Sequence, residues 1–190
     1  FCTLLEVSFT LAMADARTTQ LVQSSWATVT ASFKPEEVAG IFYDILFKAH
    51  PTLPDTLFKG IDMNVQKVAL IAMLDAAVKN LDKPEVLVPT LQALGVRHSK
   101  YGCEEVHYDA VGAALIATLA AGLGAKFTPE VKGAWVAVYG VIKSVMWEAQ
   151  QTPEGKKLFA EYQAKQKASC CGGCPCNNTV VIGVVVVAAA

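Results

Sequence analysis

The sequence predicts an all-α domain, and three observations support this. Between Thr18 and about Tyr162, apolar residues recur at three- and four-residue spacing, the periodicity of amphipathic helices. The apolar-polar alternation typical of strands is absent there, and most prolines and glycines fall at seams between the apolar segments. We therefore expect six to eight packed helices of unequal length rather than a symmetric bundle.

Length and composition favour a single soluble domain. A chain of 190 residues can bury a core without the help of disulfides. The formal net charge is -1 and there is no basic stripe, so we expect no nucleic-acid partner. Hydrophobic residues make up 53% of the chain, but no apolar run approaches the roughly 20 residues of a membrane-spanning helix.

Both ends differ from the middle, and we divide the chain into a disordered N-terminal extension at 1–17, a helical domain at 18–162 and a tail at 163–190. The opening segment is apolar, lacks the positive charge of a secretory signal and is soon followed by Met13. Residues 1–12 are therefore left out of the fold prediction.

The tail is rich in cysteine and then becomes apolar. Its four cysteines could bind a soft metal, accept palmitate or form disulfides, and we favour exposed free thiols: Cys170, Cys171, Cys174 and Cys176. The apolar string at 179–190 is too short to span a bilayer. We expect a cytoplasmic protein, with membrane contact through the tail left open.

The first helix is expected to begin after Thr18 or Thr19, a favourable cap, with one apolar stripe of Val22, Trp26, Val29 and Phe33. The second, at 35–50, has Pro35 at an early position and two glutamates in its first turn, where the helix dipole favours negative charge. The proline-rich segment 51–62 can hold only a turn or two of helix. Further helices are expected at 65–81, 86–99, 106–124, 128–151 and 153–162.

His98 is the residue on which the functional interpretation depends. Leu91 and Leu94 lie seven and four residues before it, so an apolar stripe leads to the imidazole. A lone histidine in such a place is most often a hydrogen-bonded core residue, and His50 and His107 do not share its face, which disfavours a metal site built from protein ligands alone. A haem needs only one imidazole, because the porphyrin supplies four ligands.

Five ordered blocks carry a family resemblance: IFYDILFKAHP, QKVALIAMLDAAVKNL, VRHSKYG, VHYDAVGAALIATLAAGLG and TPEVKGAWVAVYGVI. In order and spacing the chain resembles the globins, in particular the haem domain of flavohaemoglobins and single-domain bacterial haemoglobins, from about Val22 to Gln150. The resemblance implies a globin fold around a haem b pocket.

The resemblance also implies roles for individual residues. His98 matches the proximal iron ligand, and Gln66, 32 residues earlier (98 − 66), matches the distal position. Tyr43 matches the distal tyrosine of flavohaemoglobins, and Phe58, or its neighbour Leu57, matches the ring that stacks on the haem. The pocket walls are then completed by Leu70, one turn beyond Gln66, and Leu94.

Behind the proximal histidine, Tyr108 matches a residue that in flavohaemoglobins orients the histidine together with a glutamate. Here the glutamate position falls on Gln150, a neutral amide, while Glu148 lies about 200° away around the helix at 100° per residue. We expect a weaker electron push on the iron than in those enzymes, unless the register shifts.

Three functions follow as hypotheses. The first is reversible binding of dioxygen for storage or transport, with the Tyr43 hydroxyl and the Gln66 amide donating hydrogen bonds to the gas. The second is nitric oxide dioxygenation, which would need an external reductase because no G-x-G-x-x-G loop follows a strand. The third is a helical domain without haem, in which the matched residues only pack.

Overall fold

The computed structural model describes residues 16–170, with side chains for residues 16–167. Within that range the chain forms seven α-helices and one short 3₁₀ helix. They are α2 (Ala16–Ser32), α3 (Pro35–Ala49), α4 (Met63–Lys79), α5 (Pro84–Ser99), α6 (Glu105–Leu123), η1 (Gly124–Lys126), α7 (Pro129–Gln150) and α8 (Pro153–Cys170).

Side chains near the helix starts satisfy the first backbone N–H groups. Glu37 accepts a hydrogen bond from the Lys34 N–H at 2.8 Å, which fixes the start of α3 beside Pro35. Asp62 accepts from the N–H groups of Asn64 and Val65 at the start of α4, and Thr128 accepts from Val131 at the start of α7. The side chains of Glu37, Asp62 and Thr128 therefore help to set where α3, α4 and α7 begin.

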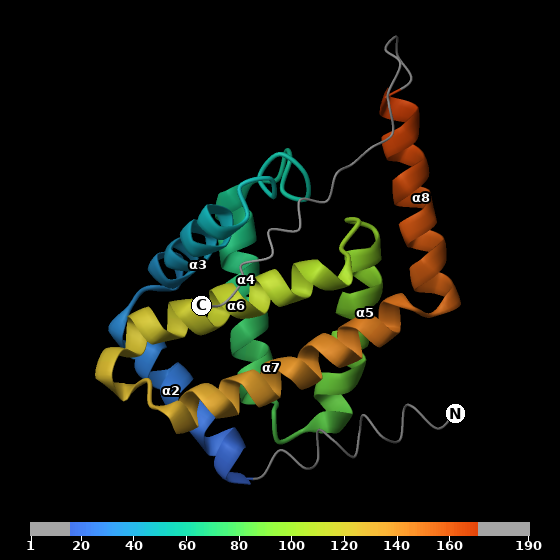
Figure 1. The fold of residues 1–190 in the computed structure, drawn as a ribbon. Helices are drawn as coiled ribbons and strands as arrows, with labels where there is room; N and C mark the ends of the chain where they lie inside the picture. The colour runs from blue at the N-terminus through green and yellow to red at the C-terminus, as the bar shows by residue number, and fades with distance from the viewer. Residues whose placement is uncertain (1–15, 171–190) are drawn as a thin grey trace, which may run out of the picture.

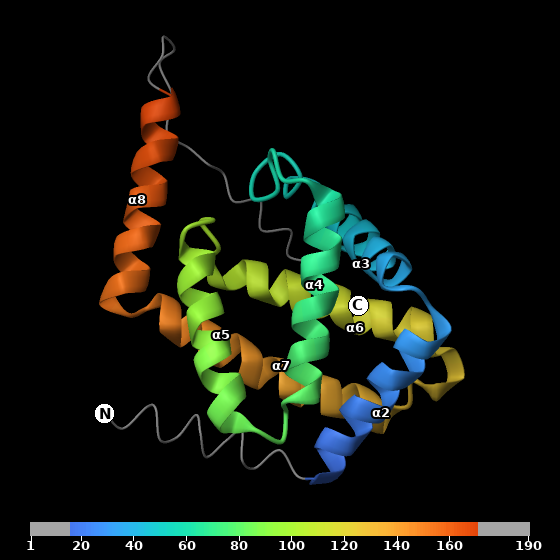
Figure 2. The same cartoon turned by 180° about the vertical axis from the view of Figure 1, so that it is seen from behind.

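The helix pairs are held around one core. In Figure 1, α6 and α7 lie side by side on the face nearest the viewer, and they pack on each other. Seen from behind in Figure 2, α4 and α5 stand roughly parallel in front of that pair, α5 packing mainly on α7 and α4 on α3 and α2.

Two tryptophans anchor the end of the core where α2 crosses α7. Trp26 and Trp135 meet edge to face, with ring centroids 6.1 Å apart. The Trp135 Nε1–H donates to Ser25 Oγ at 2.9 Å, and the Trp26 Nε1–H donates to Asp75 Oδ1 at 3.3 Å. In the stripe expected for the first helix, Val22, Trp26 and Val29 are buried, as predicted, and Phe33 is half-buried against the same core.

Helix α6 is the only helix among the described residues that is long and apolar enough to cross a membrane. It packs on α3, α7 and α2, and 44% of its most apolar window is buried inside the protein. The buried part of this apolar surface packs in the core.

Most predicted helices are confirmed within two residues, and two boundaries differ. The first helix begins at Ala16 rather than after Thr18, while residues 51–60 form turns, within the limit of a turn or two of helix set by the prolines. The largest error is at the last helix, which was expected to end near Tyr162 but continues to Cys170. Good helix formers such as Gln163, Lys165 and Lys167 follow Tyr162, and no proline or glycine interrupts them before Gly172.

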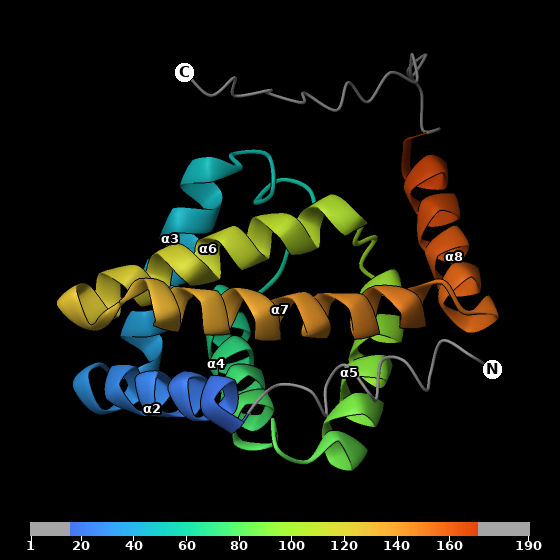
Figure 3. The same cartoon turned by 60° about the horizontal axis from the view of Figure 1, so that its bottom comes forward.

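Helix α8 therefore crosses the expected domain boundary at 162/163. It stands at the edge of the molecule beside α5, as Figure 3 shows, and packs on α5 and α7. Of the tail cysteines, Cys170 ends α8, and Cys171, Cys174 and Cys176 lie outside the described residues, so the predictions about their chemistry stay predictions.

Candidate functional site

His98 lies in the last turn of α5 with a half-buried ring. Its Nδ1 is 2.8 Å from the carbonyl oxygen of Leu94, which can only accept, so Nδ1 carries the hydrogen. Burial lowers the pKa of His98, the bond to Leu94 raises it, and the nearby Arg97 charge lowers it again. The ring is therefore neutral near pH 7, and its Nε2 presents a free lone pair.

Two aromatic rings hold the imidazole in place. Tyr108, on α6, stacks on His98 with centroids 5.9 Å apart and an interplanar angle of 28°. Tyr101, in the turn after α5, meets the His98 ring edge to face, with the ring centroids 6.1 Å apart. Since the ring is held by its Nδ1 bond and by these contacts, its rotation about the side-chain torsions is restricted.

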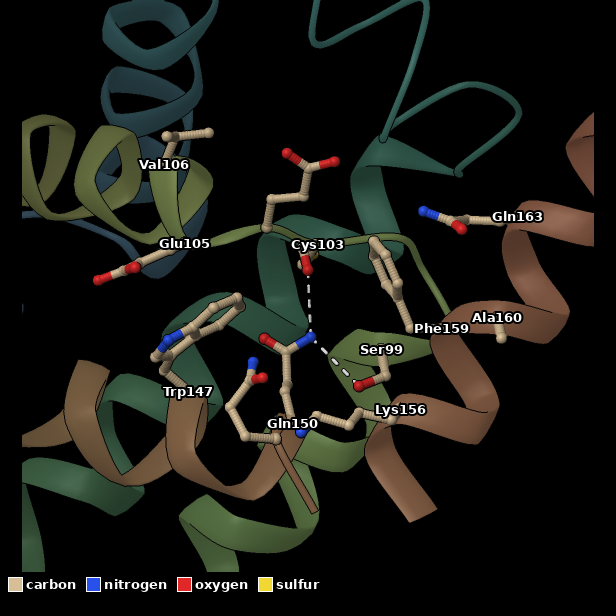
Figure 4. A pocket seen from close by; sticks show the side chains of 12 residues that line it. Ser99, Cys103, Glu105, Val106, Trp147, Gln150, Lys156, Phe159, Ala160 and Gln163 are labelled. Carbon is tan, nitrogen blue, oxygen red and sulfur yellow. Dashed lines mark hydrogen bonds between the residues drawn. The ribbon is translucent and has the colours of Figure 1, made fainter. Parts of the chain in front are cut away.

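Gln150, at the end of α7, lies at the centre of a buried hydrogen-bond network. Its Oε1 accepts from the Tyr108 hydroxyl at 2.7 Å, and its Nε2 donates to Ser99 Oγ at 3.2 Å and to the Cys103 carbonyl at 3.1 Å. The Gln150 amide lines a pocket of about 470 Å³. Figure 4 shows it hydrogen-bonded to Ser99, at the end of α5, and to Cys103, in the loop that follows. Gln150 itself is only 4% exposed, and both of its amide N–H groups and its carbonyl oxygen are hydrogen-bonded inside the protein.

The register expected at this position is the one the structure has. Gln150, and not Glu148, meets the Tyr108 hydroxyl, while Glu148 is exposed. The second nitrogen of His98 bonds the Leu94 carbonyl rather than a carboxylate. Among the described side chains, the hydrogen bond found at the imidazole is therefore to a backbone carbonyl and not to a carboxylate. The weaker electron push on a bound iron stays a prediction.

A second group of residues surrounds Tyr43 on α3. Tyr43 is a buried polar residue, with only 3% of its surface exposed. Burial raises the pKa of Tyr43, and a hydrogen bond with the Gln66 side chain of α4 lowers it, the direction expected when the amide donates to the phenol oxygen. Tyr43 therefore stays protonated near pH 7. In that arrangement its O–H is free to donate to a further acceptor.

Aromatic rings surround this pair. Phe58, in the turns before α4, meets Tyr43 edge to face at 5.6 Å and Phe47 at 5.2 Å. Phe47 itself lies 5.5 Å from Tyr43. Leu57 and Leu70 are half-buried against the core. The structure thus joins Tyr43, Gln66 and Phe58 in one distal group.

Across the part of the chain with described side chains, ring contacts and hydrogen bonds connect the distal group internally and the His98 group internally, but they do not link the two groups. The distal group combines residues of α3, the turns at 51–60 and α4, and the His98 group combines residues of α5, α6 and α7. Within the same range, no three His, Cys, Asp or Glu side chains gather as metal ligands. The Nε2 of His98 is suited to complete the coordination of a metal that already carries other ligands.

Several contributing residues were not predicted. Phe47 lies one helical turn after Tyr43, a spacing that could have identified it. Ser99, Tyr101, Cys103 and Tyr139 carry no such signal, because their roles depend on contacts between helices. Tyr139 donates to the Tyr108 carbonyl at 2.5 Å, and burial raises the pKa of the Cys103 thiol to about 12, which leaves it unreactive.

Comparisons with known proteins give consistent results. The sequence profile of the Globin family matches residues 41–146. The chain is 30% identical over 165 residues to the Flavohemoprotein of Bacillus subtilis, a match covering 82% of this chain and 41% of that protein. It is 32% identical over 132 residues to the Flavohemoprotein of Bacillus cereus, covering 68% and 32% respectively. The chain thus spans less than half the length of these relatives.

A solved structure also has a similar arrangement of helices. It is described as a hexacoordinated heme protein from an anhydrobiotic tardigrade, and it superimposes with a TM-score of 0.62 at 21% identity. The match covers 70% of this chain and 93% of that one. At this identity the likeness concerns the fold alone.

Proposed function

This chain belongs to the globin family, and from that premise we propose that it is a haem-binding protein that reversibly binds dioxygen, with His98 as the iron ligand. The observation that carries the proposal is the hydrogen bond from His98 Nδ1 to the Leu94 carbonyl. It fixes the tautomer with a free Nε2 lone pair, and burial keeps that nitrogen unprotonated.

The surrounding residues fit the group. Haem b would supply an iron that can bind a gas, with four ligands from the porphyrin; His98 Nε2 would hold that iron, and Tyr43 and Gln66 would face the gas. Phe58, Leu70 and Leu94 would contact the macrocycle as apolar walls, which is the usual lining of a cofactor site. Leu57, also half-buried, is the neighbour that would replace Phe58 if the turn shifted by one residue.

The distal pair would stabilise a polar gas. Tyr43 keeps its phenol hydrogen because its pKa is raised, and Gln66 is already bonded to it. Donors held ready in a buried place lose little entropy on meeting an acceptor, and bonds to a partly negative ligand are stronger than neutral ones. We therefore expect slow dioxygen release.

The test is the absorption spectrum of the purified protein, before and after dithionite, with hemin titration of the apoprotein. A Soret band and a reversible oxygen complex are expected. His98→Ala should weaken hemin binding by roughly a hundredfold or more, since even supporting residues of a metal site contribute tenfold to a hundredfold.

His50→Ala is the matched control, because His50 is exposed at the end of α3. If His98→Ala kept the wild-type spectrum and hemin affinity, His98 would not be the ligand. A preparation that stays colourless after incubation with hemin would refute haem binding altogether.

A second candidate function is nitric oxide dioxygenation supported by a separate reductase. The identity to two flavohemoproteins, together with Tyr43 and Tyr108 at the matching positions, favours it. The test mixes the oxygenated protein with nitric oxide and a generic reductant. Repeated nitrate formation would support the enzyme, and a single stoichiometric conversion would leave only reversible binding.

A further inference from the structure

The way α5 seats on α7 separates two rows of residues on α5. Leu91, Gly95 and Ser99 recur every four residues and are all buried, which makes them one row on the helix surface. Leu94 and His98 form the adjacent row and are half-buried. The first row rests on α7, where Gly95 meets Met146 and Ser99 meets Gln150, so it determines where the second row stands.

At Gly95 the backbones of α5 and α7 are in close contact. A Cβ added there would overlap the carbonyl oxygen of Met146 and would lie 2.8 Å from Met146 Cα and 2.9 Å from its carbonyl carbon. All three atoms are backbone, and α7 is held on its other sides by α2 and α6. A methyl group at this point can therefore be accommodated only by moving α5 away from α7.

A movement of α5 away from α7 would also displace the His98 imidazole. His98 is three residues after Gly95, about 4.5 Å along a helix at 1.5 Å per residue, and neighbours it on the surface. Gln150 ties Ser99 and the Cys103 carbonyl to α7 on the other side of His98, so the end of α5 cannot simply follow a shift at Gly95. A wider spacing between α5 and α7 would therefore tilt the row formed by Leu94 and His98.

We propose that Gly95 is a positioning residue for His98: by letting the α5 backbone rest on the Met146 carbonyl, it sets how far the imidazole projects from α7. This inference rests on the proposed role of His98 as the haem ligand. In this proposal, the lack of a side chain at position 95 sets the distance between α5 and the haem.

Four proteins test it: wild type, Gly95→Ala, Gly140→Ala and Gly155→Ala. Gly140 is on α7 with nothing within 4 Å of an added Cβ, so it is the same chemical change without a clash. At Gly155 on α8 an added Cβ would lie 2.7 Å from the carbonyl carbon of Gln150, so it is a backbone clash of similar severity that separates α8 rather than α5 from α7.

Two readouts are used on the haem-loaded protein. One is the iron–histidine stretching band in the resonance Raman spectrum of the ferrous protein after photolysis of its carbon monoxide complex. The other is the rate of hemin transfer to an excess of apomyoglobin. Gly95→Ala should shift the band and speed hemin loss about tenfold, which is within the range for overpacking a close contact. Gly140→Ala should leave the band in place, and Gly155→Ala, whose clash falls on the backbone of Gln150, should shift it less than Gly95→Ala does.

An unshifted band in Gly95→Ala, or an equal shift in Gly155→Ala, would overturn the inference. Absence of the band in the wild-type protein would instead refute the proposed function, so the two failures are distinguishable. To guard against loss of the fold, Gly95→Ala is also made together with Gly140→Ala and Gly133→Ala, two open helical positions where alanine favours the helix. The expected band shift is the same in that background.

Discussion

The proximal and distal sides of the site are built in different ways. On the proximal side, α5 rests on the backbone of α7 at Gly95, and Gln150 bonds three partners in the interior. On the distal side, one side-chain hydrogen bond joins Tyr43 to Gln66, and the rest of the contacts are between apolar rings. The proximal side is fixed by backbone and buried polar groups, and the distal side by adaptable side chains.

The burial of the two helices shows the same difference. Five residues of α5 are buried, whereas in α4 only the central residue Ile71 and, near its end, Ala77 and Val78 are. The start of α4, where Gln66 lies, carries exposed Val65 and Val68. Segments with few buried contacts open at lower free energy than the core. In the proposed function, the Tyr43 side would therefore be the one that yields when a gas enters, while the His98 side would stay fixed.

Loss of the Gln150 amide should give the largest effect on stability. Gln150→Leu would leave Tyr108 Oη and Ser99 Oγ without their partner and the Cys103 carbonyl without a donor. At about 1–3 kcal/mol for a buried group left unsatisfied, we expect a loss of about 3 kcal/mol in the free energy of unfolding. Urea denaturation of the apoprotein measures it.

Gln163→Leu is the matched control for this change. Gln163 lines the same pocket but is exposed, so its replacement should alter stability by less than about 0.5 kcal/mol. A Gln150→Leu protein as stable as this control would show that the proximal network contributes nothing, and the contrast between the two sides would fail.

Removal of the Tyr43 hydroxyl should act on the gas rather than on the fold. Tyr43→Phe keeps the ring contacts with Phe47 and Phe58 but removes the donor. A lost hydrogen bond to a charged group corresponds to about 1.5–3 kcal/mol, so dioxygen should dissociate at least roughly ten times faster. Stopped-flow displacement of oxygen by carbon monoxide measures the rate.

Tyr101→Phe provides the comparison on the other side of the site. Tyr101 also touches the site, but it is 47% exposed and meets His98 through its ring. Its replacement should leave the oxygen off-rate unchanged. Equal off-rates for wild type and Tyr43→Phe would place Tyr43 outside the gas pocket.

The sequence predicts the two sides unequally well. Helix positions follow from periodicity, and Tyr43, Gln66 and His98 follow from a family resemblance that spans most of the domain. The sequence carries no signal for the role of Gly95, because a close backbone contact leaves no pattern in one sequence. The bonds of Gln150 to Ser99 and Cys103 join residues 51 and 47 positions apart, and only the crossing of α5 and α7 brings them together.

Acid should weaken the proximal side through His98. Its pKa is lowered in the folded protein, mainly by burial, relative to an ordinary value of 6.5, so the unfolded chain binds the proton first as pH falls. The apoprotein should therefore lose stability as pH drops below about 6.5, and His98→Gln, which cannot titrate, should lose less. Urea midpoints at pH 7.5 and pH 5.5 for both proteins test this. Identical pH dependence in the two would exclude His98 as the cause.

The smallest effect is expected at Glu148, and it tests the register of the proximal network. Glu148 is exposed and about 200° around α7 from Gln150, so Glu148→Gln should change stability by less than about 0.5 kcal/mol and leave the iron–histidine band in place. Gln150→Glu is the informative partner, since it puts a carboxylate against the Tyr108 hydroxyl and the Cys103 carbonyl. Because His98 Nδ1 is bonded to Leu94, that charge can reach the imidazole only through the stacked Tyr108 ring. A band that moves with Glu148→Gln but not with Gln150→Glu would mean that α7 has rotated, and that the fixed side of the site is not the one described above.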